Sequence, residues 1–149
     1  MKAVTEGITT TVRDCVEVIN KMDEIFFSSK PAPDKWSKKE IVGHLVDSAQ
    51  NNLQRFVRTQ YEENPRIVYA QDDWVRIQHY QSCDSRALLQ LWTALNDHLC
   101  NVLVNMPPES YEATCDVGKS AVDKRTLKFL AEDYLVHMRH HVQQIVSGK

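Results

Sequence analysis

The sequence predicts an all-α protein, built as a bundle of four amphipathic helices. Four segments repeat apolar residues at steps of three and four, which is the period of a helix with one buried face. Glycine is rare, with four among 149 residues, which argues against a turn-rich all-β fold. Hydrophobic residues make up 42% and charged residues 26%, as in ordinary globular chains, so we expect one domain over residues 1–149.

The first two helices are predicted on either side of a proline-containing turn. The first carries one apolar stripe (Ile8, Val12, Cys15, Val16, Ile19, Met22 and Phe26) and ends before Pro31 and Pro33. The second begins at Ser37 and runs to about Gln60. Glu40 follows Ser37 by three residues, the pattern of a capping box in which each side chain satisfies a free backbone N–H group.

The last two helices are predicted from the same kinds of signal, which are caps, apolar stripes and prolines. The third starts near Asp84–Ser85, stops at Pro107–Pro108, and carries an apolar stripe (Leu88, Leu91, Leu95, Leu99, Val102 and Met106). The fourth runs from about Thr126 to Val146. A long connection, residues 61–83, separates helices two and three and contains a short helical pattern at 71–80. Residues 109–124 are polar and are expected to be irregular. Four helices with one apolar face each bury those faces most simply as a bundle.

Charge and composition limit the kinds of partner and the cellular compartment that we expect. The net charge is −2 and the pI about 6.3, so no basic stripe for nucleic acid is present and no nucleic-acid partner is expected. The N-terminal residues lack the pattern of a signal peptide, and no apolar run approaches the roughly 20 residues of a membrane span. Four cysteines without Cys-x-x-Cys spacing are typical of reduced thiols. We therefore expect a cytoplasmic protein without a membrane partner.

Three histidines fall at inward positions of two helices. His137 and His141 are four residues apart on the stripe of the fourth helix, so their imidazoles point the same way. His44 lies between Ile41 and Leu45 near the inward face of the second helix. Three imidazoles from two helices can bind Zn²⁺, Ni²⁺ or Fe²⁺ and leave a coordination position open. The pattern alone is equally compatible with hydrogen-bonded core histidines, or with cations that offset a helix dipole. His98 on the third helix is a further candidate, as a fourth ligand or a polar core residue.

Polar residues accompany these histidines. Ser48, Asn51 and Arg55 continue from His44 down one side of the second helix, where a core helix would carry Leu or Val. Ligating histidines usually donate their second ring N–H to a carboxylate or carbonyl, and Asp47 and Asp133 are near enough in sequence to accept it.

Three segments together resemble the DinB/YfiT-like superfamily. The segment 36–48 (WSKKEIVGHLVDS), followed by Asn51, Asn52 and Arg55, resembles its second helix. Asp133-Tyr134 with 137–145 (HMRHHVQQI) resembles its last helix, and 69–75 (YAQDDWV) is similar to a segment between them. The matches span most of the chain in the family's order and spacing.

This resemblance implies an up-down-down-up four-helix bundle in which His44, His137 and His141 bind one metal ion. It also implies a small-molecule substrate and, since relatives are often dimers, a homodimer. Some relatives are transferases that attach a low-molecular-weight thiol, such as bacillithiol, to electrophiles. In that reading Asn51 and Arg55 bind a polar group of the thiol. Others are described as metal-dependent hydrolases, in which Asp47 or Tyr134 would assist proton transfer. A non-catalytic metal-binding or stress-related protein is the third hypothesis.

Overall fold

A computed structural model describes residues 1–147 and shows four long helices. They are α1 (Lys2–Asn20), α3 (Lys38–Arg58), α5 (Ser85–Asn105) and α6 (Leu127–Val146). The connections contain the short helices α2 (Glu24–Ser28) and α4 (Gln71–Gln78) and the 3₁₀ turns η1 (Tyr80–Ser82) and η2 (Pro108–Ser110). They also contain two short strands, β1 (Thr114–Asp116) and β2 (Lys124–Thr126). The predicted all-α class and the long connection with its short helix are confirmed.

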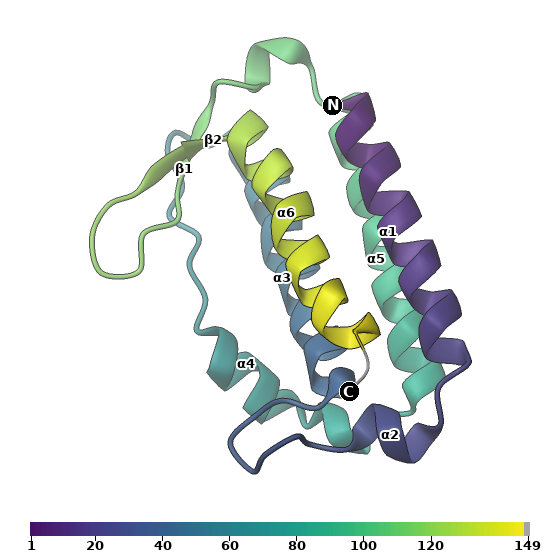
Figure 1. Cartoon of the computed structure of the whole chain (residues 1–149). Helices are drawn as coiled ribbons and strands as arrows, with labels where there is room; N and C mark the ends of the chain where they lie inside the picture. The colour runs from purple at the N-terminus through teal and green to yellow at the C-terminus, as the bar shows by residue number, and fades with distance from the viewer. Residues whose placement is uncertain (148–149) are drawn as a thin grey trace.

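The four long helices form the up-down-down-up arrangement. In Figure 1, α1 and α6 run in one direction and α3 and α5 in the other. α3 packs against both α5 and α6, and α1 packs against the other sides of α5 and α6. The consecutive helices α3 and α5 are therefore parallel neighbours, which is possible only because the long connection carries the chain back to the starting end of α3.

Helix α3 is the most enclosed element. Every residue from Lys39 to Ala49 is buried, including polar ones, because α5 and α6 cover one side and the connection with α4 covers the other. The apolar core that surrounds α3 draws on all four long helices, with Ile8, Leu45, Trp92 and Leu127 fully or almost fully buried. Polar residues on α3 therefore lie inside the protein.

The predicted helix starts are confirmed by side-chain caps. The Ser37 Oγ accepts a hydrogen bond from the Glu40 N–H, and the Glu40 carboxylate accepts one from the Ser37 N–H, which is the expected capping box. Asp84 caps α5 and Thr126 caps α6 in the same way, each through one side-chain oxygen.

Two sequence expectations are corrected. The first helix ends at Asn20 instead of continuing to Phe26. The side chain of Asp23 accepts hydrogen bonds from the N–H groups of Ile25 and Phe26, and so it caps a new helix, α2, that runs in another direction. The segment 109–124 is not irregular throughout, because β1 pairs with β2 in an antiparallel hairpin. Strands of three residues are too short for a period of two to be visible in the sequence.

Over residues 1–147, none of the helices combines the length and the apolar character needed to cross a bilayer. The four cysteines are free thiols in this structure, as expected.

Candidate metal centre

Three histidines from two helices meet at one point. His44 comes from α3, and His137 and His141 from α6, and their candidate ligand atoms all lie within 4.8 Å of one another. The Nε2 atoms of His44 and His137 are 3.2 Å apart, and the ring centroids are separated by 4.6 to 5.1 Å. Two nitrogens bound at about 2.0–2.1 Å to one tetrahedral ion are separated by roughly 3.3 Å. The spacing therefore fits two ligands of a shared ion.

The helix arrangement explains this meeting. His137 and His141 are one turn apart on α6, so both point toward α3. Because α3 and α6 are antiparallel neighbours, the beginning of α3 lies beside the end of α6, and His44 faces the pair. The structure brings these three predicted residues together, whereas His98 is exposed on α5 and lies outside the cluster.

Burial keeps these imidazoles neutral. Removal from water, together with the neighbouring histidines, lowers the pKa of His44 to about 3 and that of His137 to about 4. Burial also lowers the pKa of His141, partly opposed by a hydrogen bond to Gln144. At neutral pH each ring therefore retains a lone pair, which is the form that binds a metal ion. The donor set and its spacing both fit a divalent cation.

Gln144 orients one of these rings. Its side-chain oxygen lies 2.8 Å from the Nδ1 of His141, and since an amide oxygen only accepts, Nδ1 carries the hydrogen. The Nε2 of His141 is then left with its lone pair available for an ion. Sequence reasoning missed this role, although Gln144 follows His141 by three residues and lies on the same side of α6.

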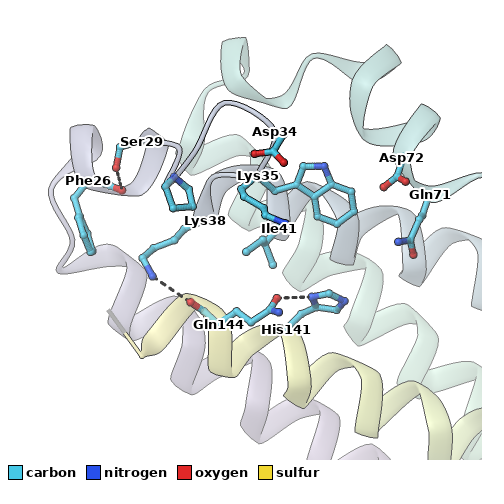
Figure 2. A pocket seen from close by; sticks show the side chains of 12 residues that line it. Phe26, Ser29, Asp34, Lys35, Lys38, Ile41, Gln71, Asp72, His141 and Gln144 are labelled. Atoms are coloured by element: carbon cyan, nitrogen blue, oxygen red, sulfur yellow. Dashed lines mark hydrogen bonds between the residues drawn. The ribbon is translucent and has the colours of Figure 1, made fainter. Parts of the chain in front are cut away.

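A cavity of about 870 Å³ opens beside the histidines. Figure 2 shows His141 and Gln144 on one side and Asp34, Lys35 and Asp72 across from them. The lining combines apolar and charged residues from α2, α3, α4, α6 and the loop before α3 (Phe26, Ser29, Pro31, Asp34, Lys35, Trp36, Lys38, Ile41, Gln71, Asp72, His141 and Gln144). Such a volume is that of a small-molecule site. Trp36 joins the cavity to the centre, because its ring lies 5.1 Å from the His44 ring.

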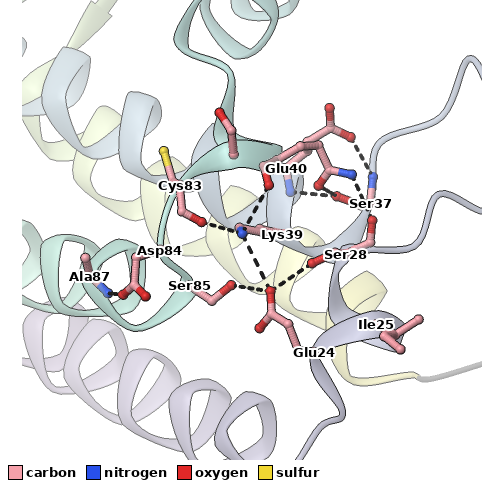
Figure 3. Close-up of polar contacts among 12 residues, drawn as sticks. Glu24, Ile25, Ser28, Ser37, Lys39, Glu40, Cys83, Asp84, Ser85 and Ala87 are labelled. Atoms are coloured by element: carbon pink, nitrogen blue, oxygen red, sulfur yellow. Dashed lines mark hydrogen bonds and ion pairs between the residues drawn. The ribbon is translucent and has the colours of Figure 1, made fainter.

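A buried lysine fastens the start of α3, which carries His44. Lys39 donates to the backbone carbonyls of Gln81 and Cys83 and forms an ion pair with Glu24 at 3.6 Å (Figure 3). Glu24 also accepts hydrogen bonds from Ser85 and Ser28. This network joins α2, η1 and the start of α5 to α3, so the wall of the cavity and the helix that carries His44 are tied together.

The two residues predicted to assist proton transfer lie in different surroundings. Asp47 is fully buried one turn after His44, and its Oδ1 accepts hydrogen bonds from the Tyr80 hydroxyl at 2.5 Å and from Gln78 at 2.7 Å. Burial raises the pKa of the Asp47 carboxyl. Tyr134 is also buried, and its hydroxyl donates to Asn96 on α5 at 2.6 Å, which directs it toward the core between the helices.

The two residues predicted to bind substrate are both engaged with protein groups. The Asn51 side chain donates to the backbone carbonyl of Asp47. Arg55 donates twice to the backbone carbonyl of Ile67, at 3.2 and 3.0 Å, and so holds the long connection against α3. Asp133, a candidate partner for a ligating histidine, is exposed.

Comparison with known sequences identifies the family to which this chain is similar. The sequence model of the DinB superfamily matches residues 8–145. A protein of Bacillus mycoides (strain KBAB4), named "Putative metal-dependent hydrolase", is 29% identical over 113 residues, which cover 75% of this chain and 64% of the relative. A protein of Oceanobacillus iheyensis with the same description is 28% identical over 116 residues, with the same coverage. The chain thus spans 64% of the length of these relatives.

Two solved structures share the fold. YfiT from Bacillus subtilis, described as "a probable metal-dependent hydrolase with an unusual four-helix bundle topology", superposes with a TM-score of 0.89 at 19% identity. The match covers 98% of this chain and 83% of YfiT. The DinB-like protein YjoA from the same organism superposes with a TM-score of 0.66 at 16% identity, over 97% of this chain and 88% of YjoA.

Proposed function

This chain belongs to the DinB superfamily, and from that premise we propose that it is a divalent-metal-dependent enzyme that transfers a small thiol to an electrophilic carbon. The observation that carries the proposal is the cluster of three neutral imidazoles beside a cavity of small-molecule size. His44, His137 and His141 would hold the ion, and an all-imidazole set suits Zn²⁺, Ni²⁺ or Fe²⁺.

A bound ion would supply Lewis acidity and so would lower the pKa of a thiol or a water molecule beside the three imidazoles. The residues around it position the reactants. Gln144 fixes the ring of His141, Trp36 covers one side of His44, and the cavity receives the electrophile. In the reaction, the thiol sulfur forms a bond to carbon, the bond from that carbon to the leaving group breaks, and the leaving group departs with the electron pair. The thiol proton passes to solvent.

A thiol fits this centre better than water does. A thiol loses its proton more readily than water does, so it depends less on a neighbouring base that takes up the proton. Within residues 1–147, no carboxylate is hydrogen-bonded to the three histidines, and the buried Asp47 carboxylate already accepts two hydrogen bonds. Lys35 lines the cavity and offers a positive charge to a carboxylate on the substrate.

The test is formation of a thioether. Protein loaded with Zn²⁺, Ni²⁺ or Fe²⁺ is incubated with monochlorobimane and a panel of low-molecular-weight thiols that includes bacillithiol. We expect faster conjugation with at least one thiol, lost in His137→Ala and after treatment with a chelator. His98→Ala is the matched control, because His98 is exposed on another helix, and it should keep the full rate. No acceleration with any thiol and metal would overturn the proposal.

The second candidate is a metal-dependent hydrolase, and the names of the relatives favour it. The same two variants distinguish it. Release of product from a panel of amides and esters, lost in His137→Ala but kept in His98→Ala, would assign hydrolysis in place of thiol transfer. Ion binding without turnover in either assay would support a non-catalytic metal-binding protein.

A further inference from the structure

Two buried polar atoms on α3 have no hydrogen-bond partner in the described part of the chain. They are the Nδ1 of His44 and the Oδ2 of Asp47, and both side chains are 0% exposed. A buried polar atom without a partner is costly, so such atoms are uncommon and call for an explanation. These two are complementary, since an imidazole Nδ1 can donate a hydrogen and a carboxylate oxygen can only accept one.

The two atoms belong to residues that face each other along the helix. His44 and Asp47 are three residues apart on α3, and at that spacing Cβ atoms are about 5–6 Å apart on one face. The His44 Nε2 is the atom next to His137, so Nδ1 is the nitrogen on the other side of the ring. The two atoms are not hydrogen-bonded to each other in the structure, so the bond between them requires a rotation of one of the side chains.

The Asp47 carboxylate is held in place from outside α3. Its other oxygen accepts from Tyr80 and Gln78, both of the long connection. Tyr80 reaches this position because position 43 is glycine, since a Cβ there would fall inside the Tyr80 ring. His79, with a φ of 51°, turns the chain between α4 and η1 and so directs Tyr80 toward α3. The free oxygen of Asp47 is therefore oriented by a docked aromatic residue.

We propose that Asp47 is the positioning residue of the metal centre: its Oδ2 accepts the Nδ1 hydrogen of His44 and so keeps the lone pair of Nε2 directed at the ion. The proposal rests on the proposed metal site and adds the group that orients its most buried ligand. Because Tyr80 and Gln78 already donate to the Oδ1 of Asp47, the Oδ2 is the oxygen left to accept a hydrogen bond from His44. Tyr80 and Gly43 act through Asp47, because they fix where its carboxylate lies.

The substitution Asp47→Asn makes a sharp test. Tyr80 and Gln78 still donate to the amide oxygen, so the NH₂ group takes the place of Oδ2 and faces His44. Two donors cannot pair, so His44 is expected to move its hydrogen from Nδ1 to Nε2. In metal-free protein, ¹⁵N NMR of the imidazoles should show the Nδ1–H tautomer of His44 in the natural sequence and the Nε2–H tautomer in the variant. The same tautomer in both proteins would overturn the proposal.

Ion affinity gives an independent readout. Competition between protein and chelator for Zn²⁺ should show about 10- to 100-fold weaker binding by Asp47→Asn. Asp84→Asn removes the same charge at the cap of α5, which carries no ligand, and should bind like the natural protein. Unchanged affinity in Asp47→Asn would refute the positioning role. If the natural protein bound no divalent ion, the proposed function would fail, while the NMR of the metal-free protein would still decide the hydrogen bond.

A change at position 43 checks the same path from a distance. Gly43→Ala places a methyl group where the Tyr80 ring lies, so Tyr80 must move and Asp47 loses a donor. Zn²⁺ affinity should fall in the same direction as in Asp47→Asn, although residue 43 is not a ligand. Tyr80→Phe keeps the ring and removes only the hydroxyl, and a smaller loss is expected. Normal affinity in both variants would separate Tyr80 from the metal centre.

Discussion

The two halves of α3 both carry polar side chains into the interior, but only one half leaves them unpaired. In the second half, Asn51 and Asn52 donate to backbone carbonyls one turn earlier, and Arg55 donates to Ile67. In the first half, His44 and Asp47 are equally buried, yet each retains an atom without a partner.

The difference indicates what each half is for. Buried polar groups are normally satisfied, and those of the second half use their hydrogen bonds to hold α3 and the long connection together. The first half instead places His44 beside His137 and His141 of α6, next to a cavity, and its two unpaired atoms are those of the proposed Asp47–His44 hydrogen bond.

The largest expected effect is a loss of Zn²⁺ affinity, tested by substituting one residue in each half of α3 separately. His44→Ala removes one of the three histidine ligands. Zn²⁺ binding should weaken roughly 100- to 1,000-fold if the free energy of binding is shared among these histidines and one further ligand in the open position. Asn52→Ala removes a buried amide of the second half and should leave Zn²⁺ affinity unchanged. Chelator competition measures both. Equal losses of affinity would mean that ion binding reports only the integrity of the fold.

A smaller effect is expected from Arg55→Met, which tests the second half alone. The change removes two hydrogen bonds to the Ile67 carbonyl, so the free energy of unfolding should fall by about 1.5–3 kcal/mol while Zn²⁺ affinity stays the same. Urea unfolding of the metal-free protein measures the loss. A raised KM for a thiol with unchanged stability would instead assign Arg55 to the substrate, as the sequence suggested.

The smallest expected effect per residue concerns pH. In the folded protein the pKa of His44 is about 3 and that of His137 about 4, below the value of about 6.5 in an unfolded chain. Between these values the unfolded chain binds more protons, so the stability of the metal-free protein should fall as the pH drops below 6.5. The slope is at most about 1.4 kcal/mol per pH unit for each histidine.

Urea unfolding at pH 7.5, 6.5 and 5.5 in the presence of chelator would measure this dependence. Glutamine does not titrate, so the stability of His137→Gln should depend less on pH than that of the natural protein. Asn52→Ala removes no titrating group, so its stability should depend on pH as that of the natural protein does. A stability that does not change between pH 6.5 and 5.5 would contradict the burial of neutral imidazoles at His44 and His137.

Much of this molecule is readable from local signals. The Ser37–Glu40 capping box and the caps at Asp84 and Thr126 act over three residues, so the starts of α3, α5 and α6 were predictable. The pairing of His137 with His141 follows from a spacing of one helical turn. The break at Asp23 was missed because the apolar stripe continues across it to Phe26, although an Asp cap is also a local signal.

The sequence by itself determined which residues can be ligands, since helix period and residue chemistry depend only on near neighbours in the chain. The tertiary structure decided which polar residues are already satisfied. Asp47 meets Tyr80, 33 residues away, and Arg55 meets Ile67, and both contacts depend on how the long connection folds back over α3. It also brought His44 to His137 across 93 residues. Such contacts are set by the packing of helices, because only packing fixes distances between side chains that the chain itself leaves free.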